Sequence, residues 1–223
     1  MIIHENIEII HYFLQVDKAP FEKMLTQLLA EYKAIHTPVR MVIFDAPMDN
    51  EEYIARFACI REAVKGIFKE NQPTVSYVAQ PPQTMGLLME VHEVKLTEQD
   101  HIKYRMQGDL PYITIEREGC KRLFLSGVTG DVLHQSIREQ SHEVFFRIAG
   151  VLEAEDMPVS SIIRQWNYIE KITACDTTGH QHYQDFNDAR SLFYNGVEWT
   201  TGYPAATGIG TQWGGIMIDV DAL

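Results

Sequence analysis

Hydrophobic and polar positions follow two different periods along the chain, and these periods separate predicted helices from predicted strands. In the first half, apolar residues recur at helical spacing within residues 19–35, at Phe21, Leu25, Leu28, Leu29 and Tyr32. A second helix is predicted for residues 50–70. Shorter apolar runs predict strands at residues 7–15, 38–46, 73–79 and 86–96.

The second half repeats this mixture of periods. Strands are predicted at residues 112–118, 122–128, 160–169, 203–210 and 215–223, and helices at residues 131–155 and 182–195. The segment 96–110 is polar and is predicted to be a linker. Strands interleaved with two helices in each half predict an α+β fold, in which each unit is a mixed β-sheet with two helices on one face.

The chain also contains an internal repeat. The segment GLLMEVHEV (86–94) matches GIMIDVDAL (215–223) at a spacing of 129 residues. A phenylalanine and an arginine on the second predicted helix of each half keep the same spacing, namely Phe57 and Arg61 in one half and Phe186 and Arg190 in the other. We therefore predict two tandem units, a degenerate N-terminal one in residues 1–98 and a C-terminal one in residues 111–223.

The second half resembles the RidA/YjgF superfamily, whose members are often called endoribonuclease L-PSP-like proteins. The resemblance rests on LFLSGVTGD, FNDAR, PAATGIG and IMIDVDAL. The run RQWNYIEKI…HYQDFNDAR…PAATGIG is most similar to the chorismatase branch, which has two such units, each with a chorismate-mutase-like fold, and acts on chorismate. Deaminases of the superfamily carry an arginine where this chain has Ala206, and chorismatases continue beyond the last strand matched here. A non-catalytic protein on the same scaffold is therefore the alternative.

Charge and composition narrow the classes of partner. The chain has 223 residues and a net charge of −12, so it lacks the basic surface that a nucleic-acid partner needs, and an endoribonuclease activity is disfavoured. The three cysteines, Cys59, Cys120 and Cys175, show no metal or disulfide spacing. Neither a signal peptide nor a membrane span is evident, so no membrane partner and a cytoplasmic location are expected.

The first group of candidate site residues lies on the strand IIRQWNYI. Strand alternation places Arg164, Trp166 and Tyr168 on one face. An arginine beside two aromatic rings is suited to a carboxylate on a partly apolar body. The alternative is an edge-strand arginine paired with an acid, with the tryptophan in the core.

The second group lies in PAATGIG. Small residues allow a ligand to approach the backbone, so Thr207, Gly208 and Gly210 are candidate substrate-binding residues. Close packing of the sheet or a β-bulge explains the same pattern equally well.

Two acids on the last predicted strand are candidate catalytic residues. Asp219 and Asp221 share a face, where mutual repulsion would raise one pKa and create a proton donor. The resemblance makes Asp221 the better match to the family's proton-transfer group. The alternative is a solvated strand face. The matching positions of the first half, Glu90 and His92, differ, which indicates that one copy is active.

These candidate residues leave open whether the protein is an enzyme, and a chorismatase-like hydrolase or lyase is the class they suggest. The preferred function is binding or chorismatase-like hydrolysis of a small carboxylate-bearing metabolite, by protonation of an enol ether and addition of water. The alternative is a non-catalytic small-molecule-binding or assembly protein, and an imine deaminase is disfavoured. His180 and His182 lack a third ligand, so no metal and no cofactor are predicted. The resemblance implies a homo-oligomer, with a trimer as the arrangement it suggests.

Overall fold

The computed structural model describes residues 7–82, 86–199 and 202–223. The first part of the chain forms a four-stranded sheet in the order β1-β4-β2-β3, in which only the β2–β3 pair is parallel. Its elements are β1 (Ile9–Val16), α1 (Phe21–Glu31), β2 (Thr37–Phe44), α2 (Asn50–Phe68), the short 3₁₀ helix Lys69–Asn71, β3 (Thr74–Val78) and β4 (Leu87–Val94).

The remainder forms a six-stranded sheet in the order β5-β6-β7-β10-β8-β9, in which only the β8–β9 pair is parallel. Its elements are β5 (His101–Gln107), β6 (Leu110–Arg117), β7 (Cys120–Thr129), α3 (Ile137–Ala154), the 3₁₀ helix Val159–Ser161, β8 (Ile162–Glu170), α4 (His182–Phe193), β9 (Ala205–Thr211) and β10 (Ile216–Ala222).

The two sheets share one topology, which confirms the predicted α+β fold of tandem units. The order β1-β4-β2-β3 reappears as β7-β10-β8-β9, and the closing strands β4 and β10 occupy the same inner position. The repeated Phe–Arg pairs also agree. Phe57 and Phe186 are buried, and the guanidinium carbons of Arg61 and Arg190 lie 4.0 and 5.6 Å from their ring centroids. The domain limits 1–98 and 111–223 remain predictions.

Two predicted boundaries are wrong. The predicted linker contains β5, which pairs with β6 along its whole length across a turn at Gly108, so this polar segment is an edge strand of the second sheet. The predicted helix at residues 131–155 begins only at Ile137. Ser136 and Glu139 form a capping box there, and the Asp131 side chain accepts hydrogen bonds from two backbone N–H groups of the preceding turn. This S-x-x-E signal was present in the sequence and was overlooked.

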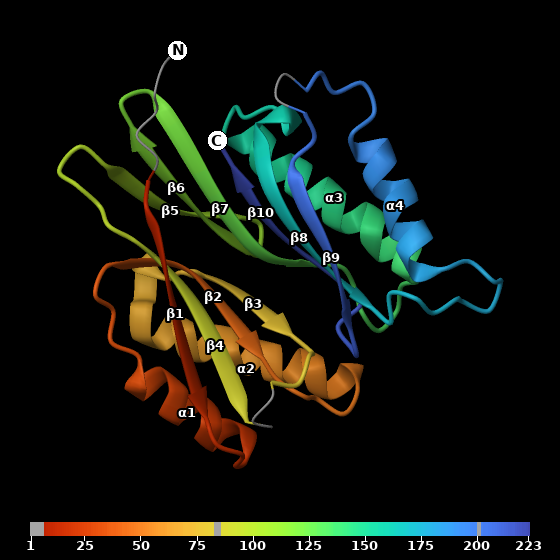
Figure 1. Cartoon of the computed structure of the whole chain (residues 1–223), viewed down its shortest axis with the longest axis horizontal. Helices are drawn as coiled ribbons and strands as arrows, with labels where there is room; N and C mark the ends of the chain where they lie inside the picture. Colours follow the sequence, from red (N-terminus) through yellow and green to blue (C-terminus); the bar gives the residue numbers. More distant parts are fainter. Residues whose placement is uncertain (1–6, 83–85, 200–201) are drawn as a thin grey trace.

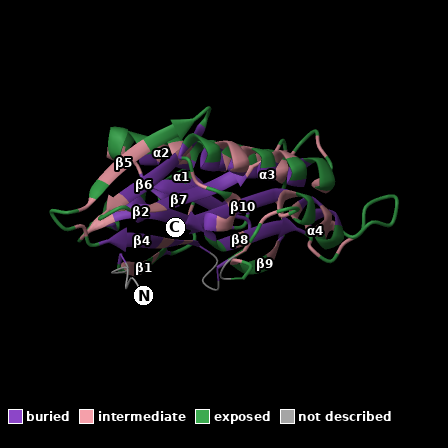
Figure 2. Ribbon diagram, turned by 90° about the horizontal axis from the view of Figure 1, so that it is seen from above, coloured by how far each residue is buried: buried purple, intermediate pink, exposed green. Residues whose placement is uncertain are grey.

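The two sheets lie between the two helix pairs (Figure 1), and the strands form the buried centre of the molecule (Figure 2). The predicted apolar face of α1 packs into the first core, which also includes Tyr168 and Met217 from the second sheet. A separate apolar cluster joins the sheets through Val39 and Val94 on one side and Ile113, Ile115 and Phe124 on the other. The sheets therefore share their core. Within the described ranges, no helix is long and apolar enough to cross a membrane.

Candidate functional site

A cavity of about 550 Å³ lies between the two sheets, and both contribute to its walls. Arg40 comes from β2, and the first sheet adds His11 from β1 with Glu90 and His92 from β4. The second sheet contributes Arg122 from β7, Arg164, Trp166 and Tyr168 from β8, and Asp219 and Asp221 from β10. Five of the eight predicted site residues thus meet at one cavity.

The β8 strand presents its predicted face to this cavity. Arg164, Trp166 and Tyr168 line it, whereas Gln165 and Asn167 are buried on the opposite side of the sheet. The Arg164 guanidinium lies 4.8 Å from the Trp166 ring centroid. No hydrogen bond or ion pair from any described residue engages this exposed guanidinium, which argues against the alternative of an edge arginine paired with an acid.

A second arginine contacts the same indole ring. The guanidinium carbon of Arg40 lies 4.7 Å from the Trp166 centroid, and its side chain is only 1% exposed. Arg40 Nη2 donates to Asp221 Oδ1 at 2.7 Å, and Nε donates to Ser126 Oγ at 2.6 Å. Its buried Nη1 has no hydrogen-bond partner among the residues described. One donor of a buried guanidinium at the cavity is therefore unused.

The two predicted catalytic acids lie side by side on β10 but in different environments. Both oxygens of Asp221 contact arginines, with Oδ1 2.7 Å from Arg40 Nη2 and Oδ2 3.5 Å from Arg122 Nη2. Asp219 Oδ1 accepts hydrogen bonds from Ser76 Oγ at 2.6 Å and from the Gly127 N–H at 2.8 Å. Asp219 Oδ2 accepts no hydrogen bond from the described part of the chain, and it lies 4.0 Å from Arg40 Nε.

Burial, rather than the predicted repulsion between the two acids, is the main cause of a raised pKa at this pair. Removal from water raises the pKa of Asp219, and the charge of Arg40 opposes that rise. The predicted cause, repulsion from Asp221, is not among the main contributions to this pKa. The alternative of a solvated face is also wrong, because the side chains of Asp219 and Asp221 are only 1% and 4% exposed.

The comparisons with known proteins show the family of the chain. Residues 88–222, more than half of the chain, match the model described as chorismatase FkbO/Hyg5-like, N-terminal. The chain belongs to this FkbO/Hyg5-like chorismatase family. A comparison with curated protein sequences found no match.

A solved chorismatase structure shares this fold. A crystal structure of a chorismatase is 14% identical, with a TM-score of 0.59 over 97% of this chain and 54% of that one. This chorismatase-family chain therefore spans about half the length of that protein. A putative translation initiation inhibitor from Salmonella typhimurium is 15% identical, with a TM-score of 0.40 over 54% of this chain and 96% of its own. A YjgF/YER057c/UK114 family member from Mycobacterium tuberculosis is 14% identical, with a TM-score of 0.36 over 49% and 82% of the two chains.

The PAATGIG segment of this chorismatase-family chain does not line the cavity. A Cβ at Gly208 would lie 3.4 Å from Tyr183 and 3.5 Å from Ile172, and one at Gly210 would lie 2.7 Å from Ile172. The glycines therefore allow close packing against neighbouring side chains, which was the alternative explanation. Thr207 lies opposite Trp166 in the β8–β9 register but is outside the cavity lining.

Sequence reasoning missed the contribution of the first sheet. His11 Nδ1 and His92 Nε2 each lie 2.9 Å from Glu90 Oε1, at the same cavity as the two aspartates. These hydrogen bonds, the one from His92 foremost, lower the pKa of Glu90 to about 2 against the opposing effect of burial. Burial in turn lowers the pKa of His92. The only sequence signal was the alternating E-V-H of the closing strand, because the partner His11 lies on a different strand.

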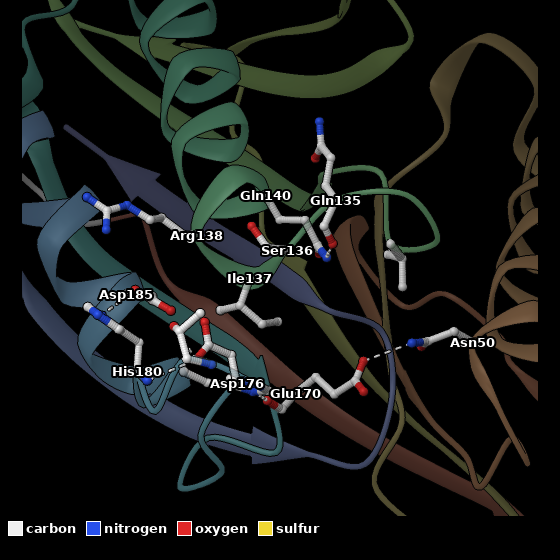
Figure 3. A pocket seen from close by; sticks show the side chains of 13 residues that line it. Asn50, Gln135, Ser136, Ile137, Arg138, Gln140, Glu170, Asp176, His180 and Asp185 are labelled. Atoms are coloured by element: carbon white, nitrogen blue, oxygen red, sulfur yellow. Dashed lines mark hydrogen bonds and ion pairs between the residues drawn. The ribbon is translucent and has the colours of Figure 1, made fainter.

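A second cavity, of about 440 Å³, lies near the N-terminal ends of α3 and α4 (Figure 3). Glu170 Oε2 accepts hydrogen bonds from Asn50 Nδ2 and the Gly215 N–H, both at 3.0 Å, and thereby ties α2 to the second sheet. Asp176 accepts from the backbone N–H groups of Thr178 and His180. The acids here are engaged in structural bonds, so this cavity is the weaker candidate.

Proposed function

We propose that the chain binds a small carboxylate-bearing metabolite with an apolar body in the cavity between its two sheets. The observation that carries this proposal is the guanidinium of Arg164, which lies over Trp166 at the cavity and has no acidic partner within the described residues. A guanidinium held against an aromatic ring keeps its in-plane donors free for a bidentate carboxylate contact.

The remaining wall supplies complementary chemistry. The unused Nη1 donor of Arg40 is a second point of attachment for an anionic oxygen. Trp166 and Tyr168 supply flat apolar surface for the body of the ligand. The cavity volume of about 550 Å³ suits a metabolite of roughly drug-like size or smaller.

Chorismate is the first candidate ligand, because family membership and fold both connect the chain to chorismatases. Hydrolysis of its enol ether would require a proton on the terminal methylene carbon and water at the adjacent ether carbon, with release of pyruvate. The geometry favours Asp219 over Asp221 as the proton donor. Burial raises the pKa of Asp219, and its Oδ2 accepts no hydrogen bond from the described residues and lies 4.0 Å from the nearest arginine nitrogen. Both oxygens of Asp221, in contrast, lie within 3.5 Å of guanidinium nitrogens.

The test measures both binding and turnover of chorismate by the purified full-length chain. Isothermal titration with chorismate measures binding, and a coupled lactate dehydrogenase assay measures pyruvate release. Arg164→Gln is expected to weaken binding by at least about tenfold, which corresponds to a charge-assisted hydrogen bond of about 1.4 kcal/mol or more. Arg138→Gln, an exposed arginine at the second cavity, is the matched control and should bind as the wild type does. Absence of binding by the wild type would remove the proposal, and equal binding by Arg164→Gln would remove the role of that residue.

Asp219→Asn separates binding from catalysis. If the protein hydrolyses chorismate through Asp219, this variant should bind chorismate but release no pyruvate. Pyruvate release at the wild-type rate by Asp219→Asn would exclude Asp219 as the proton donor.

The second candidate function is binding without turnover. It is favoured by the near-complete burial of Asp219 and by the pairing of Asp221, which together leave no exposed carboxyl group on β10 at the cavity. Chorismate binding without pyruvate release would select it. Imine deamination and RNA cleavage stay disfavoured by Ala206 and by the net charge of −12. Self-association, a trimer included, also remains a proposal, and light scattering would test it.

A further inference from the structure

Three potential metal ligands meet on the cavity face of the first sheet. His11 and His92 are directly opposite each other in the antiparallel β1–β4 pair, and Glu90 precedes His92 by two positions on the same face. The ligand atoms of the three side chains lie within 4.8 Å of one another. The positions of all three are fixed by one strand pairing, so the cluster is preorganised.

We propose that His11, Glu90 and His92 form a binding site for a divalent transition-metal ion of the zinc class. Two imidazoles and one carboxylate are the donor set of catalytic His₂Glu zinc sites, in which a fourth position stays open for water or a ligand. Imidazole donors favour Zn²⁺, Co²⁺ or Ni²⁺ over Mg²⁺ and Ca²⁺, which prefer oxygen ligands. The open position would face the cavity.

The hydrogen bonds within this cluster leave one of its ring nitrogens without a partner. Both imidazoles share one oxygen of Glu90, each at 2.9 Å. The other ring nitrogen of His92, Nδ1, is buried and has no partner among the described residues. A buried polar atom without a partner is unfavourable, and a flip of the ring by about 180° around χ2 would exchange the places of the two nitrogens.

The surrounding charges permit a cation. Arg40 pairs in register with His92, but Asp221 at 2.7 Å and Asp219 at 4.0 Å compensate its charge. The His92 ring centroid lies 6.4 Å from that of Trp166, so the proposed ion site adjoins the aromatic side chain of β8.

Metal binding by the chelator-treated full chain tests the proposal without any substrate. Titration calorimetry with Zn²⁺ should show one ion per chain, and Co²⁺ should give the visible absorption bands of a four- or five-coordinate site. His11→Ala is the first variant, because His11 is on the exposed edge strand and its loss does not open the core. His11→Ala and Glu90→Gln should each weaken binding by at least about tenfold, as loss of a direct ligand does.

The control is His134→Ala, because His134 also pairs with a carboxylate, Asp131 at 2.9 Å, but on the exposed surface. It should leave the Zn²⁺ affinity unchanged. Absence of stoichiometric binding by the wild type would show that the three side chains only share protons and would overturn the proposal. So would wild-type affinity in both His11→Ala and Glu90→Gln, or a loss of affinity in His134→Ala. Arg164→Gln should retain metal binding, so this result is independent of the proposed carboxylate site.

Discussion

Replacement of Arg40 is the sharpest test of how the two sheets are joined. The side chain is 1% exposed and donates to Asp221 Oδ1 at 2.7 Å, to Ser126 Oγ at 2.6 Å and to two backbone carbonyls. Arg40→Met keeps an apolar stem of similar length but leaves Asp219 and Asp221 without this charge. Removing one partner of a buried ion pair costs about 3–5 kcal/mol. That is a large part of a typical total stability of about 5–15 kcal/mol.

The same variant has a predictable pH dependence. Burial already raises the pKa of Asp219 in the folded protein, and Arg40 opposes that rise, so Arg40→Met should raise this pKa further. A carboxyl group with a raised pKa in the folded state favours folding when it is protonated. Stability associated with it is therefore lost as pH rises through that pKa. The destabilisation by Arg40→Met should accordingly be larger at pH 7 than at pH 5.

Urea denaturation at both pH values measures these changes as free energies of unfolding. Arg147→Met is the matched control, since Arg147 pairs with Asp109 at 2.6 Å but Asp109 is 78% exposed, and it should cost less than about 1 kcal/mol. The double variant Arg40→Met/Asp221→Asn should be less destabilised than the sum of its single changes. A loss under about 1 kcal/mol for Arg40→Met at pH 7, or one that does not shrink at pH 5, would refute this account of the inter-sheet contact.

Two further stability predictions follow from local geometry, each with a control in the same chain. Gly127→Ala should unfold at lower urea concentration than Gly119→Ala. Both positions have positive φ, 65° at Gly127 and 79° at Gly119. A Cβ at Gly127 would lie 2.2 Å from the Val75 carbonyl oxygen, whereas nothing lies within 4 Å of a Cβ at Gly119. We therefore expect Gly127→Ala to lose about 1–3 kcal/mol more stability than Gly119→Ala. Ser136→Ala should lower the free energy of unfolding by about 0.5–2 kcal/mol because it removes the capping box of α3. The control Ser161→Ala removes a buried hydroxyl without a described partner and should cost less. Equal losses in the two variants would contradict the capping argument.

Much of the fold was accessible from the sequence because its main signals are local. Alternation along β8 correctly placed Arg164, Trp166 and Tyr168 on one face, since successive side chains of a strand point to opposite sides. The 129-residue spacing correctly aligned the closing strands, because both are inner strands whose apolar pattern is set by burial on two faces. The metabolite role of these residues remains a prediction.

The missed features depend on contacts between distant segments. Arg40 pairs in register with His92, and Arg164 pairs with Asp221, so the two arginines occupy equivalent positions. They are 124 residues apart, however, while the closing strands are 129 apart, and the difference concealed the match. In β5 a strand pattern was present, because Ile102, Tyr104 and Met106 alternate with polar residues, but the polar residues around it favoured a linker and none of its side chains is fully buried.

The duplicated topology explains why one cavity has two chemically different walls. Equivalent inner strands place Glu90 and His92 on one wall and Asp219 and Asp221 on the other. On the second wall the acids are held by Ser76, Gly127 and the arginines Arg40 and Arg122. The bonds from Ser76 on β3 and Arg40 on β2 join the two sheets. On the first wall the Glu90 side chain makes its hydrogen bonds to imidazoles alone among the residues that the structure describes. Because the acids of β10 also hold the sheets together, Glu90 of the first unit, despite the divergence of that unit, is the carboxylate that is freer to bind an ion.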